Sequence, residues 1–220
     1  MRFRGNARPS IMNIAVLASH EGTTLQAILD ACSRGVLDAG VGIVVSNNAD
    51  SGAIRRASDA GVAHAHLSGK THSDAEALDR ALLSAIEAVA ADVIFLAGYM
   101  KKLGPLTLGR YTGRIFNTHP ALLPKYGGKG MYGIHVHRAV LAAGDLESGA
   151  TVHLVDGEYD TGPIVAQRRV DVLPGDTPET LAERVQSCER GLVVDFLGDI
   201  AHGKIALPFR EARPEGWRGE

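Results

Sequence analysis

Residues 73–98 read SDAEALDRALLSAIEAVAADVIFLAG, and this stretch decides the fold class. Its first part carries an apolar stripe at the spacing of an amphipathic helix: Ala77, Leu78, Leu82, Ile86 and Val89. Its last part, residues 92–98, is a continuous apolar run, which is typical of a strand buried on both faces. A helix that leads directly into such a strand indicates a βαβ unit and a parallel sheet.

The same alternation continues along the rest of the chain. Further strands are predicted at residues 11–19, 40–47, 63–67, 114–117, 150–155 and 164–172. Further helices are predicted at residues 24–35, 51–61, 136–143 and 179–200, the last of them after the capping sequence Thr177-Pro178-Glu179. We therefore expect a Rossmann-like α/β fold with three αβα layers and a mostly parallel sheet. The last two strands are joined by a tight polar link, so we expect them to form an antiparallel edge hairpin.

Composition narrows the function classes. The 220 residues are 45% hydrophobic with a formal net charge of −2, which argues against nucleic-acid binding and against a polybasic membrane anchor. No apolar run approaches the ~20 residues needed to span a bilayer. The two cysteines, Cys32 and Cys188, are far apart, which fits a cytoplasmic protein without a disulfide framework. We expect one domain over residues 1–220, with loose tails at 1–10 and about 211–220.

The first predicted strand ends in the turn Ser19-His20-Glu21-Gly22-Thr23-Thr24. A glycine beside hydroxyl groups at a helix N-terminus can bind a phosphate through backbone N–H groups. The ordinary alternative is a helix cap supplied by Thr23 or Thr24, and the turn alone favours that alternative. The turn lacks the G-x-G-x-x-G pattern, so it does not support a dinucleotide site.

Asn117 and His119 lie two residues apart at the end of a predicted strand, so their side chains point the same way. An amide and an imidazole that converge on one point can stabilise an oxyanion, and one such donor typically contributes about 3 kcal/mol. The alternative is strand-end capping with a hydrogen-bonded histidine. Pro120 restricts the backbone that leaves the strand, and this favours a site.

Asp160 lies in the turn Tyr159-Asp160-Thr161-Gly162-Pro163 between two predicted strands. Such an aspartate is usually a turn residue. Beside His119 it would instead raise the histidine pKa and exchange protons with it. His135 and His137 diverge at a predicted helix start and have no third ligand at a suitable spacing, so we expect no metal.

These features together resemble the folate-dependent formyltransferases, over residues 12–203. The most specific segments are Asn117-x-His119-Pro120 with Leu122-Leu123-Pro124, and Asp160-x-Gly162-Pro163. Supporting segments are FLAGYM at residues 95–100 and VQSCE at residues 185–189. The resemblance implies a formyltransferase fold and a cytoplasmic enzyme, a monomer or homodimer, that binds small-molecule substrates and neither nucleic acid nor membrane.

The implied reaction transfers the formyl group of 10-formyltetrahydrofolate, the donor cosubstrate, to the primary amine of glycinamide ribonucleotide in purine biosynthesis. The resemblance gives Asn117 and a protonated His119 the role of oxyanion partners. It gives Asp160 the role of a proton relay that keeps His119 charged. No metal or covalent intermediate is needed.

The resemblance also implies binding residues for both substrates. The phosphorylated ribosyl amine would contact Gly22, Thr23, Thr24, Gln186 and Glu189. The folate would contact Met100, Lys101, Leu103, Asp156, Gly157, Glu158 and Tyr159. Two segments depart from the usual family pattern: the turn before Thr24, which carries Glu21, and the glycine-rich loop at residues 127–133, a candidate lid.

The sequence alone leaves three other functions open. The same chemistry can serve a different amine, such as a sugar or a substrate of a specialised pathway. Water can replace the amine, which would make the protein a formyltetrahydrofolate hydrolase. A non-catalytic nucleotide-binding domain would not need Asn117, His119 and Asp160 together.

Overall fold

The computed structural model describes residues 11–209. The tails predicted at residues 1–10 and 211–220 lie outside the described residues. The described strands are β1 (Met12–Leu17), β2 (Ala39–Ser46), β3 (Ala63–His66), β4 (Val93–Leu96), β5 (Ile115–His119), β6 (Glu147–Leu154) and β7 (Ile164–Asp171). The described helices are α1 (Thr23–Ser33), α2 (Gly52–Asp59), α3 (Ala75–Ala88), α4 (Pro105–Arg110), α5 (Ile134–Ala142) and α6 (Pro178–Ala201).

The strands form one sheet in the order β3-β2-β1-β4-β5-β6-β7. All pairs from β3 to β5 are parallel, and β6 and β7 add the antiparallel edge that the sequence predicted. The β5–β6 register places Asn117 opposite His153 and His119 opposite Thr151. Because β1, β4 and β5 are adjacent and parallel, their carboxyl ends meet at one edge of the sheet, where ligands bind in such folds.

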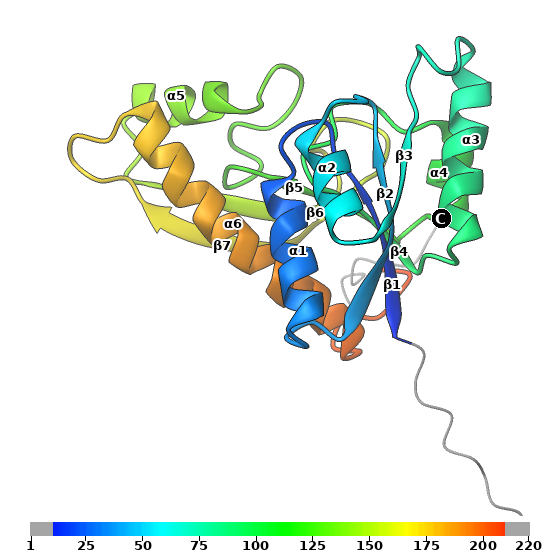
Figure 1. Cartoon of the computed structure of the whole chain (residues 1–220). Helices are drawn as coiled ribbons and strands as arrows, with labels where there is room; N and C mark the ends of the chain where they lie inside the picture. The colour runs from blue at the N-terminus through cyan, green and yellow to red at the C-terminus, as the bar shows by residue number, and fades with distance from the viewer. Residues whose placement is uncertain (1–10, 210–220) are drawn as a thin grey trace, which may run out of the picture.

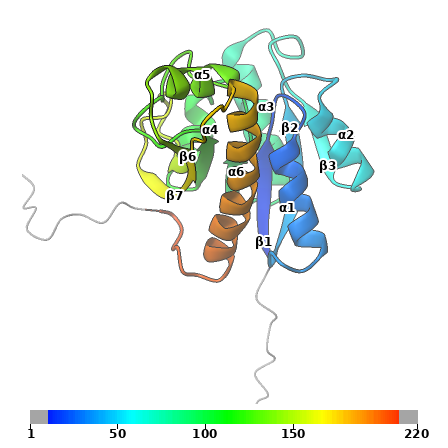
Figure 2. The same cartoon turned by 90° about the vertical axis from the view of Figure 1, so that its left-hand side faces the viewer.

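Helices cover both faces of the sheet, which confirms the three-layer prediction (Figures 1 and 2). α1 and α6 lie side by side on one face, while α3 and α4 lie on the other. Each face has its own buried apolar cluster. On the first face Phe116 of β5 meets Phe196 of α6 edge-to-face, with ring centroids 4.9 Å apart. This contact fixes α6 against the strand that carries Asn117 and His119.

The helix α4 was not predicted. It has only six residues and begins with Pro105, so its apolar periodicity is too short to recognise. Its N-terminus is held by Asp79 of α3, which accepts hydrogen bonds from the backbone N–H groups of Leu106 and Thr107 and from the Thr107 hydroxyl. A carboxylate from another helix therefore supplies the cap that the local sequence lacks.

Of the two helix N-caps considered in the sequence, those of α6 and α1, only that of α6 has the expected side-chain cap. Thr177 caps α6 as predicted, with reciprocal hydrogen bonds between Thr177 and Thr180. The alternative interpretation of the first turn, a threonine cap on α1, is not found, because the N-cap is Gly22 in the left-handed conformation (φ +69°) and no side chain caps the helix. The hydroxyl of Thr24 instead donates to Glu189 on α6, over 3.0 Å.

Candidate active site

His119 ends β5 with its imidazole buried, 4% exposed. Its Nε2 lies 2.7 Å from the carbonyl oxygen of Tyr126. A carbonyl only accepts hydrogen bonds, so Nε2 carries a proton and Nδ1 is the nitrogen that faces Asp160, at 3.4 Å. Tyr126 adopts a left-handed backbone conformation (φ +58°), and this unusual geometry belongs to the residue whose carbonyl holds the imidazole.

Asp160 joins two histidines. Its side chain is 10% exposed, and its two oxygens lie 3.4 Å from His119 Nδ1 and 3.4 Å from His153 Nε2. The backbone N–H of Gly128 donates to the same carboxylate over 2.9 Å. Asp160 also has a positive φ of +58°, so the turn holds this carboxylate in a backbone conformation that non-glycine residues seldom adopt.

The charges in this group follow from burial and neighbours. Burial raises the pKa of Asp160, but the two neighbouring imidazoles, His153 and His119, and the Gly128 N–H together bring that pKa below its ordinary value. Burial lowers the pKa of His119, and this outweighs the opposing effect of Asp160. Asp160 therefore favours the protonated imidazole without raising its pKa above the ordinary value, and the expectation that Asp160 keeps His119 charged stays a prediction.

His153 is a site residue that the sequence reasoning missed. Its ring is buried, and its Nε2 lies 3.0 Å from Nδ2 of Asn117. Since His153 Nδ1 donates to the Leu154 carbonyl oxygen, Nε2 of the neutral ring accepts from the Asn117 amide. The available signal was the alternation of Thr151 and His153 in an otherwise apolar strand, which places both on one face.

A cavity of about 50 Å³ lies directly beside this group. Its lining includes five of the predicted folate residues: Lys101, Leu103, Gly157, Glu158 and Tyr159. Asn117, His153 and Asp160 line it as well, so the structure brings the catalytic and folate predictions together. The predicted Met100 and Asp156 do not line it. The backbone N–H of Met100 donates to Ser19 Oγ, and Asp156 accepts from its own turn, from Glu158 N and Thr161 Oγ1.

Lys102 is a further lining residue that was not predicted. Its ammonium pairs with Glu158 at 2.8 Å and lies 5.1 Å from the ring centroid of Tyr159. These contacts hold the 156–160 loop against the end of β4. The loop thereby limits the size of this cavity.

The predicted phosphate turn lies next to this site, because the backbone N–H of Ser19 donates to the carbonyl oxygen of Gly98 after β4. The carboxylate of Glu21 is 73% exposed and lies 3.7 Å from Arg55. The side chain that departs from the family pattern is therefore largely in solvent and lies beside α2. Gln186 is exposed on α6 and makes no side-chain hydrogen bond within residues 11–209.

Glu189 is the one predicted substrate residue with a strongly shifted pKa. Burial raises that pKa to about 7, although the Thr24 hydroxyl and Arg190 act in the opposite direction. A carboxyl group of this kind is protonated more readily than an ordinary glutamate, and it gains charge when an ammonium or hydroxyl group binds to it.

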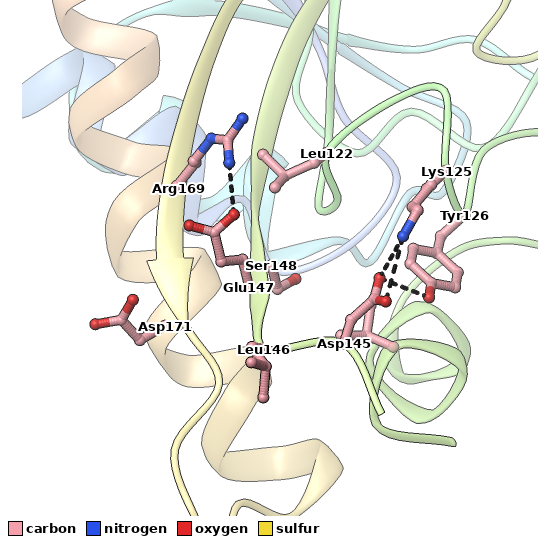
Figure 3. Close-up of a pocket in the computed structure, with 10 residues that line it drawn as sticks. Leu122, Lys125, Tyr126, Asp145, Leu146, Glu147, Ser148, Arg169 and Asp171 are labelled. Carbon is pink, nitrogen blue, oxygen red and sulfur yellow. Dashed lines mark hydrogen bonds and ion pairs between the residues drawn. The ribbon is translucent and has the colours of Figure 1, made fainter. Parts of the chain in front are cut away.

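A larger cavity, about 610 Å³, lies elsewhere, around the start of β6 (Figure 3). There the side chains of Lys125 and Tyr126 converge on Asp145, while Arg169 pairs with Glu147. None of the predicted site residues lines this cavity. Lys125 and Asp145 are paired with each other, and their pKa shifts follow mainly from that pairing. The smaller cavity lies beside the buried Asp160 carboxylate and its two imidazoles, and it is the better candidate for chemistry.

No cluster of three or more metal-ligating side chains occurs within residues 11–209. His135 is exposed and His137 is buried, so the two side chains diverge as predicted. Across the same residues no helix combines the length and apolar character that a bilayer crossing requires. Cys32 and Cys188 are both free thiols.

Comparison with known proteins identifies the family. The family model described as formyl transferase matches residues 12–197. The phosphoribosylglycinamide formyltransferase of Escherichia coli (strain K12) is 40% identical over 94% of this chain and 95% of its own length. The corresponding protein of Mycobacterium tuberculosis is 41% identical over 90% of this chain and 89% of its own. The crystal structure of glycinamide ribonucleotide transformylase 1 from Symbiobacterium toebii superposes with a TM-score of 0.82, at 36% identity over 90% of this chain and 91% of that one. The chain belongs to the formyl transferase family.

Proposed function

We propose that this protein transfers the formyl group of 10-formyltetrahydrofolate to the primary amine of glycinamide ribonucleotide, a step of de novo purine biosynthesis. The names and high coverage of the relatives support the acceptor. The observation that carries the chemistry is the buried Asp160 carboxylate, 3.4 Å from each of two imidazoles and beside Asn117 at the cavity wall.

The reaction proceeds by direct attack of the amine on the formyl carbon. A C–N bond forms and the formyl oxygen becomes an oxyanion. Asn117 has a second amide N–H besides the one directed at His153, and this N–H donates to the oxyanion. The attacking nitrogen loses a proton and N10 of the folate gains one. The bond from the formyl carbon to N10 then breaks, which yields the formylated amine and tetrahydrofolate.

In this reaction Asp160 accepts a proton and His119 stabilises the oxyanion. Asp160 is ionised and takes the proton of the attacking amine, directly or through a water molecule. In the unliganded protein both nitrogens of His119 face protein groups, Tyr126 and Asp160. His119 therefore assists the oxyanion only after the Tyr126 carbonyl gives way, and the negative oxyanion then favours the protonated imidazole that burial otherwise disfavours.

Both substrates lie at the carboxyl edge of the sheet. The phosphate binds at the N-terminus of α1, at Gly22, Thr23 and Thr24, where the helix has no side-chain cap of its own. Gln186 and Glu189 on α6 hold the ribose and the glycinamide. The folate lies along Met100, Lys101, Leu103 and the 156–160 loop. It enters when the Lys102–Glu158 contact opens.

One assay tests this function against its alternatives. The protein is incubated with 10-formyltetrahydrofolate and glycinamide ribonucleotide, tetrahydrofolate release is followed by absorbance, and the formylated ribonucleotide is identified by mass spectrometry. Turnover that requires this amine supports the proposal. Turnover only with a different amine makes the protein a formyltransferase of another pathway. Release of formate without any amine makes it a hydrolase.

The proposal also covers the domain organisation, location, oligomeric state and ligands of the protein. Residues 1–220 act as one formyltransferase domain in the cytoplasm, as a monomer or homodimer, and bind only small molecules. The folate is a cosubstrate, and the reaction as written needs no metal.

A further inference from the structure

We propose that Arg56 of α2 is a positioning residue that shapes the phosphate site and sets the preference of the enzyme for a phosphorylated acceptor. The inference rests on the proposed function, because it assumes that the substrate phosphate binds at the N-terminus of α1. It concerns a residue in a different helix, 35 positions beyond the carbonyl group that it contacts.

Arg56 makes two hydrogen bonds to residues at the start of α1. Its Nε donates to the carbonyl oxygen of Glu21 over 2.7 Å, and its Nη1 donates to Oε1 of Gln26 over 2.8 Å. One guanidinium thereby joins α2 to the residue before the α1 N-cap and to the first turn of α1. Both bonds are charge-assisted, which makes them stronger than bonds between neutral groups.

The first turn of α2 is in direct contact with the same backbone. The N–H of Ala53 donates to the His20 carbonyl oxygen over 3.0 Å. A Cβ on Gly52 would lie 2.6 Å from the Glu21 carbonyl oxygen, and a Cβ on Gly22 would lie 2.9 Å from Ala53 Cα. Two consecutive carbonyls, those of His20 and Glu21, are therefore held on α2.

This arrangement determines which backbone groups remain for a ligand. Within residues 11–209 the N–H groups of Thr23 and Thr24 have neither a backbone nor a side-chain acceptor, and Gly22 provides no side-chain cap. Because the carbonyls before them are turned toward α2, the N–H groups present a positive surface to an anion. Arg56 adds its own positive charge beside these groups, through its hydrogen bonds to the Glu21 carbonyl and to Gln26.

Lysine cannot replace this residue. A lysine ammonium is a compact point charge on a flexible stem, whereas the planar guanidinium presents donors at fixed angles to the carbonyl and the amide at once. The neighbouring Arg55 provides a matched control in the same helix. Its side chain is 62% exposed and lies 3.7 Å from the Glu21 carboxylate, and it donates to the Asp50 carbonyl oxygen over 2.8 Å, so it makes no contact with the Glu21 carbonyl or Gln26.

The experiment compares two acceptors, glycinamide ribonucleotide and the same compound without its phosphate, in the wild type, Arg56→Gln, Arg56→Lys and Arg55→Gln. We expect both Arg56 variants to raise KM for the ribonucleotide roughly 10- to 100-fold, the range for losing hydrogen bonds to a charged group. We expect kcat and KM for 10-formyltetrahydrofolate to stay near the wild-type values. The ratio of kcat/KM for the phosphorylated over the dephosphorylated acceptor should fall by a similar factor, and Arg55→Gln should retain it.

The outcomes separate this inference from the proposed function. No formylation of the ribonucleotide by the wild type overturns both. A wild type that formylates the ribonucleotide with no preference for the phosphate overturns the phosphate site. Strong wild-type preference that persists in Arg56→Gln, or full rescue by Arg56→Lys, overturns only the role of Arg56. If Arg56→Gln folds poorly, Gln26→Met takes its place. It removes one of the two acceptors of Arg56 and leaves α2 intact, and it should lower the ratio of kcat/KM as well.

Discussion

Asn117 and His153 face each other across the antiparallel pair of β5 and β6, with 3.0 Å between Asn117 Nδ2 and His153 Nε2. The contact orients an amide that would otherwise rotate freely about its terminal bond. It also places a second imidazole against Asp160. The proposed oxyanion donor and the proposed proton acceptor thus both lie against the same ring.

Removal of the nitrogens of His153 should therefore slow the chemical step. We expect His153→Phe, which keeps the size of the ring, to lower kcat about tenfold or more and to change both KM values little. Steady-state kinetics with each substrate varied in turn would measure this. His135→Phe, on the exposed side of α5, is the control and should behave as wild type. A kcat near the wild-type value in His153→Phe would show that Asn117 needs no such partner.

The protonation of His119 can be observed directly. Burial lowers the pKa of His119 and Asp160 opposes this, so the imidazole should titrate below its ordinary value of about 6.5. Replacement of Asp160 by asparagine removes the opposing charge, so the midpoint should move lower still. A pH titration of the His119 ring signals by NMR in both proteins tests the two statements. A higher midpoint in Asp160→Asn would reverse the electrostatic argument.

Glu189 should make stability depend on pH in the opposite sense to an ordinary carboxylate. Its pKa rises from 4.5 to about 7 on folding, so the native state binds more protons than the unfolded state between these values. This contribution to stability is complete below pH 4.5 and is lost as pH rises to about 7. Glu189→Gln lacks this loss. Urea unfolding across that range should show the wild type weakening relative to the variant, and parallel curves would contradict the prediction.

The cap that α3 supplies to α4 should matter for stability and for the folate site. Asp79 is 4% exposed and accepts three hydrogen bonds. We expect Asp79→Ala to lower the free energy of unfolding by about 2–3 kcal/mol. Because α4 begins two residues after Leu103, KM for the folate should rise as well. Denaturant unfolding and steady-state kinetics measure the two effects.

Glu76→Gln in the same helix is the control for Asp79. Its carboxylate is 68% exposed and pairs with Arg80 four residues on, so its loss should cost only ~0.5 kcal/mol. Equal destabilisation by the two substitutions would show that the interhelix cap has no special role.

Local patterns were enough to predict much of this molecule. The apolar run before Asn117 indicated a buried strand, and the spacing of Asn117 and His119 placed both side chains on one side of it. The sequence Thr177-Pro178-Glu179 was enough to predict the N-terminal cap of α6. These features depend on neighbours within a few residues, which a sequence shows directly.

The features that were missed depend on distant residues. α4 is capped by a carboxylate 27 positions away, and His153 meets Asn117 across 36 positions, through a register that the local sequence does not specify. The protonation of His119 also could not be predicted, because it depends on how deeply the ring is buried and not only on the presence of Asp160. Thr24 does not cap α1 because the N-cap is Gly22, which places Thr24 within the first turn, where its hydroxyl donates to Glu189 on another helix.

A single-turnover experiment with Asp160→Asn tests the central claim most directly. The enzyme, in excess, is mixed with 10-formyltetrahydrofolate and glycinamide ribonucleotide, and formylated product is quantified after rapid quenching, with Asp171→Asn as the control. The account predicts that Asp160→Asn binds both substrates and unfolds at the wild-type denaturant concentration, but forms product at least about 100-fold more slowly. A rate constant for product formation within about threefold of wild type in Asp160→Asn would contradict it.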